Sequence, residues 1–266
     1  MTTQISERPA AVGQGFGFAV RDIGAMTWRN LLRILRLPQL LVFATIQPLL
    51  FVLMFRYVFG GAIAVPGTDY VNFLMAGIFA QVVAFGAVNT AIGLAEDRSQ
   101  GLIERLRSLP MARSAVLAGR TFSDLVRNIF VVTLMLIVGF AVGFRLQTDV
   151  GKLLLALGLL LFFGYALSWI FALIGLWVNG AETAQAVSFP AMMVLVFASS
   201  AFVPTDSMPG WLQVWADNQP LSVTVNAVRA LVNGGPWGEY ALTSLAWSLA
   251  ILVIFVPLSV IRYRRG

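Results

Sequence analysis

Residues 96–113 read E-D-R-S-Q-G-L-I-E-R-L-R-S-L-P-M-A-R and lie between two long apolar stretches. Six of the first twelve residues of this segment are arginine or acidic, in a chain that is only 11% charged and 59% apolar. Because soluble domains are about a quarter charged, the composition indicates that most of the chain lies in lipid. A charged segment in such a chain belongs outside the hydrocarbon, and its role there decides what the protein does.

Six stretches are apolar enough, and at roughly 20 residues long enough, to cross a bilayer as helices. They cover residues 39–59, 70–94, 115–143, 152–178, 185–203 and 239–261. We therefore predict an all-α integral membrane protein with six transmembrane helices over residues 39–261. The same division leaves a flexible N-terminus at 1–16 and a basic tail at 262–266.

The basic residues predict the orientation of these spans, because arginine and lysine near span ends favour the cytoplasmic side. With both termini inside, fourteen of the eighteen basic residues are cytoplasmic. The net charge of +6 is therefore interpreted as a topology signal, and nucleic acid is not an expected partner. We predict a multi-pass protein of the cell inner (plasma) membrane with cytoplasmic N- and C-termini.

Two further segments are predicted to lie at the membrane surface. Residues 17–38 form an amphipathic helix in which three arginines fall within about 60° of one another and Trp and Leu lie opposite, which is typical of an interfacial helix. Residues 204–238, between the fifth and sixth spans, contain four prolines and three tryptophans. They predict two short re-entrant helices, at about 209–217 and 220–232, anchored in the outer leaflet by tryptophan.

The charged segment follows the second span and is therefore expected on the cytoplasmic side. Leu102, Ile103, Leu106 and Leu109 form one apolar stripe at helical spacing, and Pro110 ends the helix. Charges of both signs cover the rest, which suits docking on a soluble partner. The alternative is a loop whose arginines only enforce topology.

The segment E-D-R-S-Q-G-L-I-E-R-L-R-S-L-P-M-A-R resembles the signature of ABC-2 type permeases, especially the daunorubicin-resistance membrane subunits. The similarity extends over nearly the whole chain, including Pro48, Phe59-Gly60 and the P-x-W-L…N-Q-P-L-S…A-V-R-A-L run from Pro209 to Leu231. It implies a type V exporter-like subunit that pairs with a second permease copy, as a homodimer or a heterodimer. It also implies that two ABC ATP-binding subunits bind, each seating a coupling helix at 97–110.

The resemblance places the ATPase-coupling residues in and beside that helix, with a second cytoplasmic contact in the turn before the fifth span. They are Glu96, Asp97, Arg98, Gly101, Leu102, Glu104, Arg105, Leu106, Arg107, Leu109, Pro110 and Glu182. No G-x-x-x-x-G-K-[ST] phosphate-binding loop occurs in the chain. No catalytic residue or cofactor is therefore assigned to this chain, and ATP and Mg²⁺ would be bound by the partner ATPase.

Polar residues within spans mark a candidate substrate path, because they are costly in lipid. Gln81, Phe85 and Asn89 fall within about 80° of one another on the second span, and Ser188 and Ser199 lie on the fifth. The alternative is that these side chains only hold helices together. Outer-gate candidates are Pro204, Trp211, Asn218 and Pro220.

The third span begins with charges of both signs on one helical face. Arg120, Asp124 and Arg127 follow the i, i+4, i+7 spacing that brings side chains together on a helix. This spacing predicts a solvated, self-paired helix end.

The predicted function is the permease subunit of an ATP-driven exporter of hydrophobic or amphipathic compounds, such as drugs or antibiotics, with membrane lipid around it. A lipid or a lipid-linked glycan is the alternative cargo. The chain has no Cys and no His, which disfavours an intramembrane enzyme and a metal site. The spans carry no ring-forming charge, which disfavours an ion channel, and a non-transporting scaffold is the remaining class.

Overall fold

The structure is a computed structural model that describes residues 16–36, 38–60, 63, 65, 68–107 and 113–265. Every regular element among these residues is a helix, so the predicted all-α class is confirmed. The predicted flexible N-terminus lies, except for its last residue, outside the described part of the chain.

Four helices are long and apolar enough to cross a membrane. They are α3 (Tyr70–Ser99), α5 (Arg113–Ala141), α6 (Val150–Trp177) and α10 (Gly238–Arg265). Two shorter apolar segments occupy the positions of the other predicted spans. These are α2 (Pro38–Leu53), which continues directly into the π-helix η1 (Met54–Phe59), and α7 (Ala181–Phe197). Helix α10 continues to Arg265, so the basic residues predicted as a tail at 262–266 lie, up to Arg265, in its last turn.

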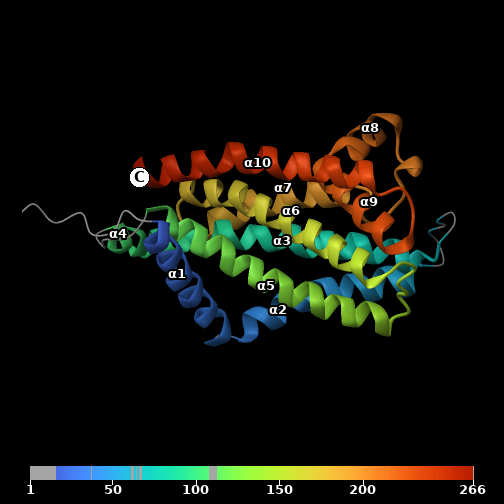
Figure 1. The fold of residues 1–266 in the computed structure, drawn as a ribbon, viewed down its shortest axis with the longest axis horizontal. Helices are drawn as coiled ribbons and strands as arrows, with labels where there is room; N and C mark the ends of the chain where they lie inside the picture. Colours follow the sequence, from blue (N-terminus) through green and yellow to red (C-terminus); the bar gives the residue numbers. More distant parts are fainter. Residues whose placement is uncertain are drawn as a thin grey trace, which may run out of the picture.

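Helix α3 is the centre of the bundle, with α5 on one side and α6 and α7 on the other (Figure 1). Its closest neighbour is α6, where Gly164 faces Val83 and Gly175 faces the backbone of Ala91. A Cβ atom at either glycine would overlap these neighbours. Small residues at such contacts allow two helices to approach closely, and this explains why almost all of α3 is buried.

The two ends of the bundle carry different short helices (Figure 1). The six-residue helix α4 (Leu102–Arg107) lies at the end where the chain terminates. At the opposite end lie α8 (Gly210–Asn218) and α9 (Pro220–Asn233). Two short helices were predicted in this second region, and their bounds agree with the prediction to within about one residue.

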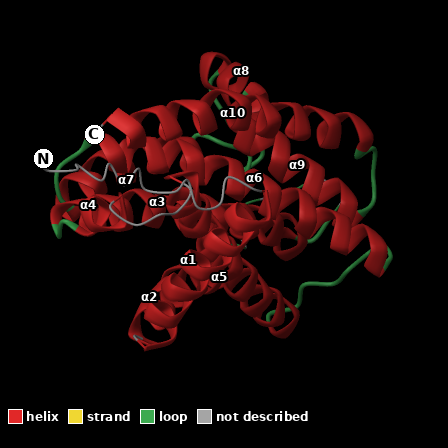
Figure 2. Cartoon of the chain, turned by 60° about the vertical axis from the view of Figure 1, so that its left-hand side comes forward, coloured by secondary structure: helices red, strands yellow, loops and turns green. Residues whose placement is uncertain are grey.

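Helix α1 (Phe16–Arg36) crosses the lower part of the bundle and packs against α5 (Figure 2). The contact is close, because a Cβ atom at Gly119 of α5 would overlap Met26 of α1. Trp28 remains 60% exposed. The helix predicted at 17–38 is therefore present, while its position at the membrane surface stays a prediction.

Candidate functional site

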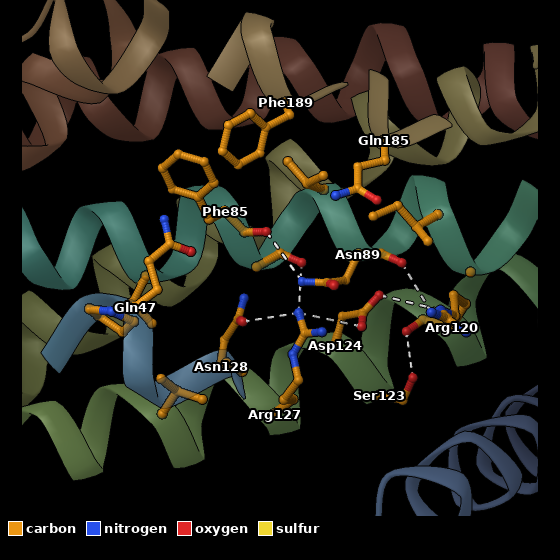
Figure 3. A pocket seen from close by; sticks show the side chains of 18 of the residues that line it. Gln47, Phe85, Asn89, Arg120, Ser123, Asp124, Arg127, Asn128, Gln185 and Phe189 are labelled. Carbon is orange, nitrogen blue, oxygen red and sulfur yellow. Dashed lines mark hydrogen bonds and ion pairs between the residues drawn. The ribbon is translucent and has the colours of Figure 1, made fainter. Parts of the chain in front are cut away.

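A cavity of about 480 Å³ lies between α2, α3, α5 and α7. Figure 3 shows aromatic, amide and charged side chains from these helices around one space. A volume of this size is typical of sites that bind small molecules, and about half of the residues that line it are polar or charged. We therefore take this cavity as the first part of the candidate site.

Three of the five predicted path residues meet in its wall. Gln81, Phe85 and Asn89 all line the cavity, because residues four apart lie on one face of α3. The Phe85 ring lies 5.5 Å, between centroids, from that of Phe189 on α7. The Asn89 amide Nδ2 donates to the Phe85 carbonyl at 3.3 Å, so this amide is already bound to its own helix.

The other two predicted path residues, Ser188 and Ser199, are buried but do not line this cavity. The Ser199 hydroxyl donates to the Val196 carbonyl. Helix α7 instead contributes Gln185 and Phe189, which are four residues apart on another face of α7. The sequence signal for Gln185 was an amide at the start of the fifth predicted span, and the sequence reasoning missed it.

A buried ionic cluster centred on Asp124 of α5 forms a further part of the wall. The Asp124 carboxylate lies 3.5 Å from Arg120 Nε and 3.6 Å from Arg127 Nη2. The Thr90 hydroxyl of α3 donates to Asp124 Oδ2 at 2.6 Å. The two arginine side chains are 14% and 11% exposed, and that of Asp124 is 2% exposed. The predicted pairing is therefore confirmed, whereas the predicted solvation of this helix end is wrong.

Helix α3 supplies hydrogen-bond acceptors for this cluster and the space in which it is buried. Arg127 Nη2 donates to the Gly86 carbonyl at 2.6 Å, and Arg120 Nη2 donates to the Asn89 carbonyl at 3.0 Å. A Cβ atom at Gly93 would overlap the Arg120 guanidinium. The glycines of α3 thus leave space for long polar side chains of α5. The sequence shows these glycines but does not show that they face α5.

The Asp124 carboxylate at the centre of this wall is engaged by other groups of the protein. The Asp124 oxygens are occupied by two guanidinium groups and one hydroxyl. A general base needs a free lone pair within reach of the substrate. Within the described ranges, no group of three or more acidic side chains is placed to hold a metal ion.

The second part of the candidate site is the charged segment, and the structure divides the helix expected at 97–110. Helix α3 continues through Ser99, so Asp97 and Arg98 belong to its last turn. The chain then turns at Gly101, whose φ of +68° favours glycine. Helix α4 begins only at Leu102.

The charged residues at the end of α3 are bound within the chain. Asp97 is buried, and its carboxylate lies 3.8 Å from Arg29 of α1. Arg98 Nη1 donates to the Leu176 carbonyl at the end of α6 at 2.7 Å. Glu96 lines the cavity. The contacts of Asp97 and Arg98 join the end of α3 to α1 and α6, so these two side chains help to hold the bundle together.

Helix α4 is attached to the bundle by its apolar side. Ile103 and Leu106 are buried in a cluster with Leu117 of α5, Trp169 of α6 and Tyr263 of α10. The same cluster contains Leu94 of α3, and α3 is the helix against which α4 mainly packs. Packed apolar side chains therefore fix α4 to the bundle.

The opposite side of α4 faces outward. Glu104 and Arg105 are exposed, and Leu102 is half-buried at the edge of the apolar cluster. Outside the described part of the chain lie the Arg107 side chain and all of Leu109 and Pro110. The surface that α4 offers to a partner is therefore polar and of both signs.

Glu182, the predicted second cytoplasmic contact, is exposed in the first turn of α7. It follows a turn at Gly180, which has a φ of +86°. Because Arg98 binds the nearby end of α6, Glu182 lies at the same end of the bundle as α4.

The predicted outer-gate residues are spread along the segment between α7 and α9 and do not line the cavity described above. Pro204 precedes a short 3-10 turn, and Trp211 is 76% exposed on α8. Asn218 donates to a carbonyl of its own helix at 2.8 Å. Pro220 is the first residue of α9, a position that suits its fixed φ.

Comparison with known proteins agrees with this helical architecture. The daunorubicin resistance ABC transporter permease protein DrrB1 of Streptomyces coeruleorubidus is 33% identical over 239 residues, which cover 89% of this chain and 84% of that protein. The probable doxorubicin resistance ABC transporter permease protein DrrC of Mycobacterium tuberculosis is 30% identical over 231 residues, 84% of this chain and 81% of that protein. The putative transport permease ycf38 of Cyanophora paradoxa is 26% identical over 250 residues, 90% and 86% of the two chains. The family model described as ABC-2 type transporter matches residues 21–233, and the chain therefore belongs to the ABC-2 type transporter family.

Proposed function

We propose that this chain is the six-span permease subunit of an ATP-driven exporter that moves hydrophobic or amphipathic compounds, of the drug or antibiotic class, out of the cell. Its family membership and the daunorubicin and doxorubicin resistance named for its relatives support this proposal. The power comes from two ABC ATP-binding subunits, which hold ATP and Mg²⁺, and a second permease copy completes the assembly.

The two shorter apolar segments supply the two remaining membrane crossings, which are the first and the fifth along the chain. The first runs without a break from Pro38 through η1 to Phe59. The second, α7, has 17 residues and, at 1.5 Å per residue, extends about 25 Å. That is a few ångströms short of a hydrocarbon core of about 30 Å, a mismatch that a bilayer accommodates by local thinning.

The orientation follows from charge and from the two ends of the bundle. The end that carries α4 also carries the basic C-terminal residues of α10, and this is the cytoplasmic side by the positive-inside rule. The end that carries α8 and α9 is then extracellular. Cargo enters the cavity from the cytoplasm or the inner leaflet and leaves past α8 and α9.

The observation that supports the coupling role is that one side of α4 is buried and the other is exposed. Its apolar side is packed on α3 and belongs to a buried cluster with residues of α5, α6 and α10, while Glu104 and Arg105 are exposed. An ATPase docked on these charges would therefore push on the bundle through side chains that are already in contact. Charge pairs of this kind give an interface its register and specificity.

The test reverses both exposed charges of α4, in the variant Glu104→Arg with Arg105→Glu. The tagged full chain is purified from its native membrane, and the ATPase that co-purifies is identified and quantified. We expect the variant to reach the membrane in normal amount and to lose at least tenfold of the bound ATPase, because like charges now meet across the interface.

The matched control reverses two charges at the other end of the bundle, in the variant Asp217→Arg with Lys152→Glu. It should retain the ATPase and transport. A Glu104→Arg, Arg105→Glu protein that keeps both its ATPase and its transport activity would contradict the docking role of α4. Recovery of no nucleotide-binding protein with the unaltered chain would contradict the permease function itself.

A further inference from the structure

We propose that a groove between α6 and α10 holds one acyl chain of a phospholipid whose headgroup carries an ammonium group, and that Glu239 attracts this headgroup. The groove shares no lining residue with the cavity described above. The lipid is a resident component of the protein rather than its cargo, so the inference goes beyond the proposed function.

The groove has a volume of about 620 Å³ and an apolar wall. Helix α6 contributes Leu155 and Phe162, among others, and α10 contributes Leu242 and Leu245. Apart from the Trp237 indole, none of the side chains that line the groove carries a polar group. Because a polar ligand group would find no hydrogen-bond partner along such a wall, the groove matches a hydrocarbon chain.

The groove is closed below and open toward the bilayer. Its floor contains Leu159 of α6 and Ala241 of α10, which are buried in one apolar cluster. Its rims are exposed, at 48% for Leu155 and 70% for Leu242. Between the rims, nothing lies within 4 Å of a Cβ atom at Gly158. A lipid of the surrounding bilayer therefore reaches the groove without any movement of the two helices.

The depth of the groove matches one leaflet. From Leu154 to Phe162, the lining of α6 rises by about 12 Å at 1.5 Å per residue, and one leaflet contributes about 15 Å of hydrocarbon. Both helices begin at the end of the bundle that carries α8 and α9 (Figure 1). Trp237, which precedes α10, lines the groove at this end, and tryptophan favours the membrane–water interface. The groove thus extends from the interface to near the middle of the bilayer, as an acyl chain does.

A helix of a second permease copy is the alternative occupant of this apolar surface. A helix about 10 Å across would need roughly 900 Å³ over a length of about 12 Å. The groove offers about 620 Å³, and an acyl chain is much thinner than a helix. The dimensions therefore favour a single acyl chain over a second copy of the chain.

The headgroup is indicated by the charges at the mouth of the groove. Glu239 lies in the first turn of α10 and falls about 60° from Leu242 on a helical wheel. It is exposed and forms no ion pair within the described ranges. At the start of α6, Asp149 and Lys152 lie 3.8 Å apart and compensate each other. The uncompensated charge of Glu239 attracts an ammonium group and repels an anionic headgroup.

The test offers the protein two lipids with the same acyl chains and different headgroups. Palmitoyl-oleoyl phosphatidylethanolamine and palmitoyl-oleoyl phosphatidylglycerol are added in equal amounts to the purified full chain in a mild detergent. Native mass spectrometry then counts the lipids that each protein molecule retains and shows whether the protein is a monomer or a dimer. We expect one retained lipid per chain, with phosphatidylethanolamine favoured about fivefold, the effect of one charge at a membrane surface.

Two variants locate the site. Gly158→Phe places a ring in the open space of the groove and should abolish the retained lipid. Its matched control is Leu249→Phe, at a position of α10 that is 52% exposed and does not line the groove, and it should retain the lipid.

Glu239→Lys changes an exposed side chain and should reverse the preference, so that phosphatidylglycerol is favoured about fivefold. Asp217→Lys introduces the same charge on α8, away from the groove, and should keep the preference of the unaltered chain. The reversal is a readout that a loss of stability alone would not produce. It also tests the inference if Gly158→Phe fails to fold.

Equal retention of the two lipids by the unaltered chain, or no retained lipid at all, would overturn the inference. So would a lipid that Gly158→Phe still retains, or a headgroup preference that Glu239→Lys leaves unchanged. A dimer that Gly158→Phe converts to monomers would show that a second copy occupies the groove. None of these outcomes decides the permease function, which the co-purification of the ATPase tests independently.

Discussion

The molecule buries arginine in two regions and compensates its charge in two different ways. In the inner cluster, Arg120 and Arg127 share one carboxylate, that of Asp124. In the outer region, Arg229 of α9 has no carboxylate within ion-pair distance in the described part of the chain. It donates instead to Asn226 Oδ1 and the Ser200 carbonyl, both at 2.8 Å. Its guanidinium carbon also lies 3.6 Å from the centre of the Phe73 ring.

The two regions differ in the number of charges that they bury. Burial lowers the pKa of Arg229 to about 9, so the side chain is still a cation at neutral pH. Oxygen dipoles and an aromatic face stabilise that single charge and connect α9 to α3 and to the chain after α7. The inner cluster instead contains three charges that depend on one another, and removing the acid leaves two like charges close together.

The largest expected effect is therefore that of Asp124→Asn. It should lower the free energy of unfolding by about 3–5 kcal/mol, because it leaves two buried guanidinium groups without their counter-charge. The measurement is equilibrium unfolding of the purified chain in mixed micelles of increasing SDS content. Asp217→Asn, at an exposed position of α8, is the matched control and should change the value by less than about 0.5 kcal/mol. An Asp124→Asn protein as stable as its control would show that the inner arginines do not need a carboxylate.

The second effect is that of Arg229→Met, which removes the cation and leaves its carbonyl partners without a donor. We expect a loss of about 1–3 kcal/mol by the same measurement, which is smaller than for Asp124→Asn because no unpaired charge remains. Arg229→Lys keeps the charge but loses the planar stacking on Phe73, and it should fall between the unaltered chain and Arg229→Met. Arg264→Met, at an exposed position near the end of α10, is the control. A larger loss in the free energy of unfolding for Arg229→Met than for Asp124→Asn would contradict this contrast between the two regions.

The sequence predicted the helices and the pairing of neighbouring side chains better than it predicted the contacts between helices. The two short helices α8 and α9 were found because residues 204–238 contain four prolines and three tryptophans, and Pro209 and Pro220 stand where a helix can begin. The pairing of Arg120 with Asp124 was found because the i, i+4 spacing decides which side chains share a helical face. Both signals are local, and a single sequence contains them.

What the sequence did not predict depends on contacts between distant segments. The burial of Asp124 requires that α3 pack on α5 with its glycines turned toward the arginines, and no periodicity within α5 contains that information. The division of the helix expected at 97–110 had a local signal in Gly101. The charged residues before Gly101, however, indicated that the second span had already ended, whereas α3 continues to Ser99. Asp97 and Arg98 remain in α3, where Asp97 pairs with Arg29 and Arg98 donates to a carbonyl at the end of α6.

The smallest expected effect concerns the space that Gly93 of α3 leaves for the Arg120 side chain. A Cβ atom at Gly93 would overlap the Arg120 guanidinium, so Gly93→Ala should displace that side chain and break its hydrogen bond to the Asn89 carbonyl. Because the far end of a flexible side chain moves at little cost, we expect a loss of only about 1 kcal/mol in the free energy of unfolding.

Gly158→Ala on α6 is the matched control for this change, since nothing lies within 4 Å of a Cβ atom at that position. It should leave the stability unchanged or raise it by up to about 1 kcal/mol, because alanine favours a helix interior over glycine. Combining Gly93→Ala with Arg120→Ala separates the causes: the cost of the alanine at Gly93 should vanish once the guanidinium is absent. If that cost persists, Gly93 is needed for the packing of α3 itself. The arginines of the inner cluster would then be held by Asp124 and by the carbonyls of α3, and the space at Gly93 would not be needed for them.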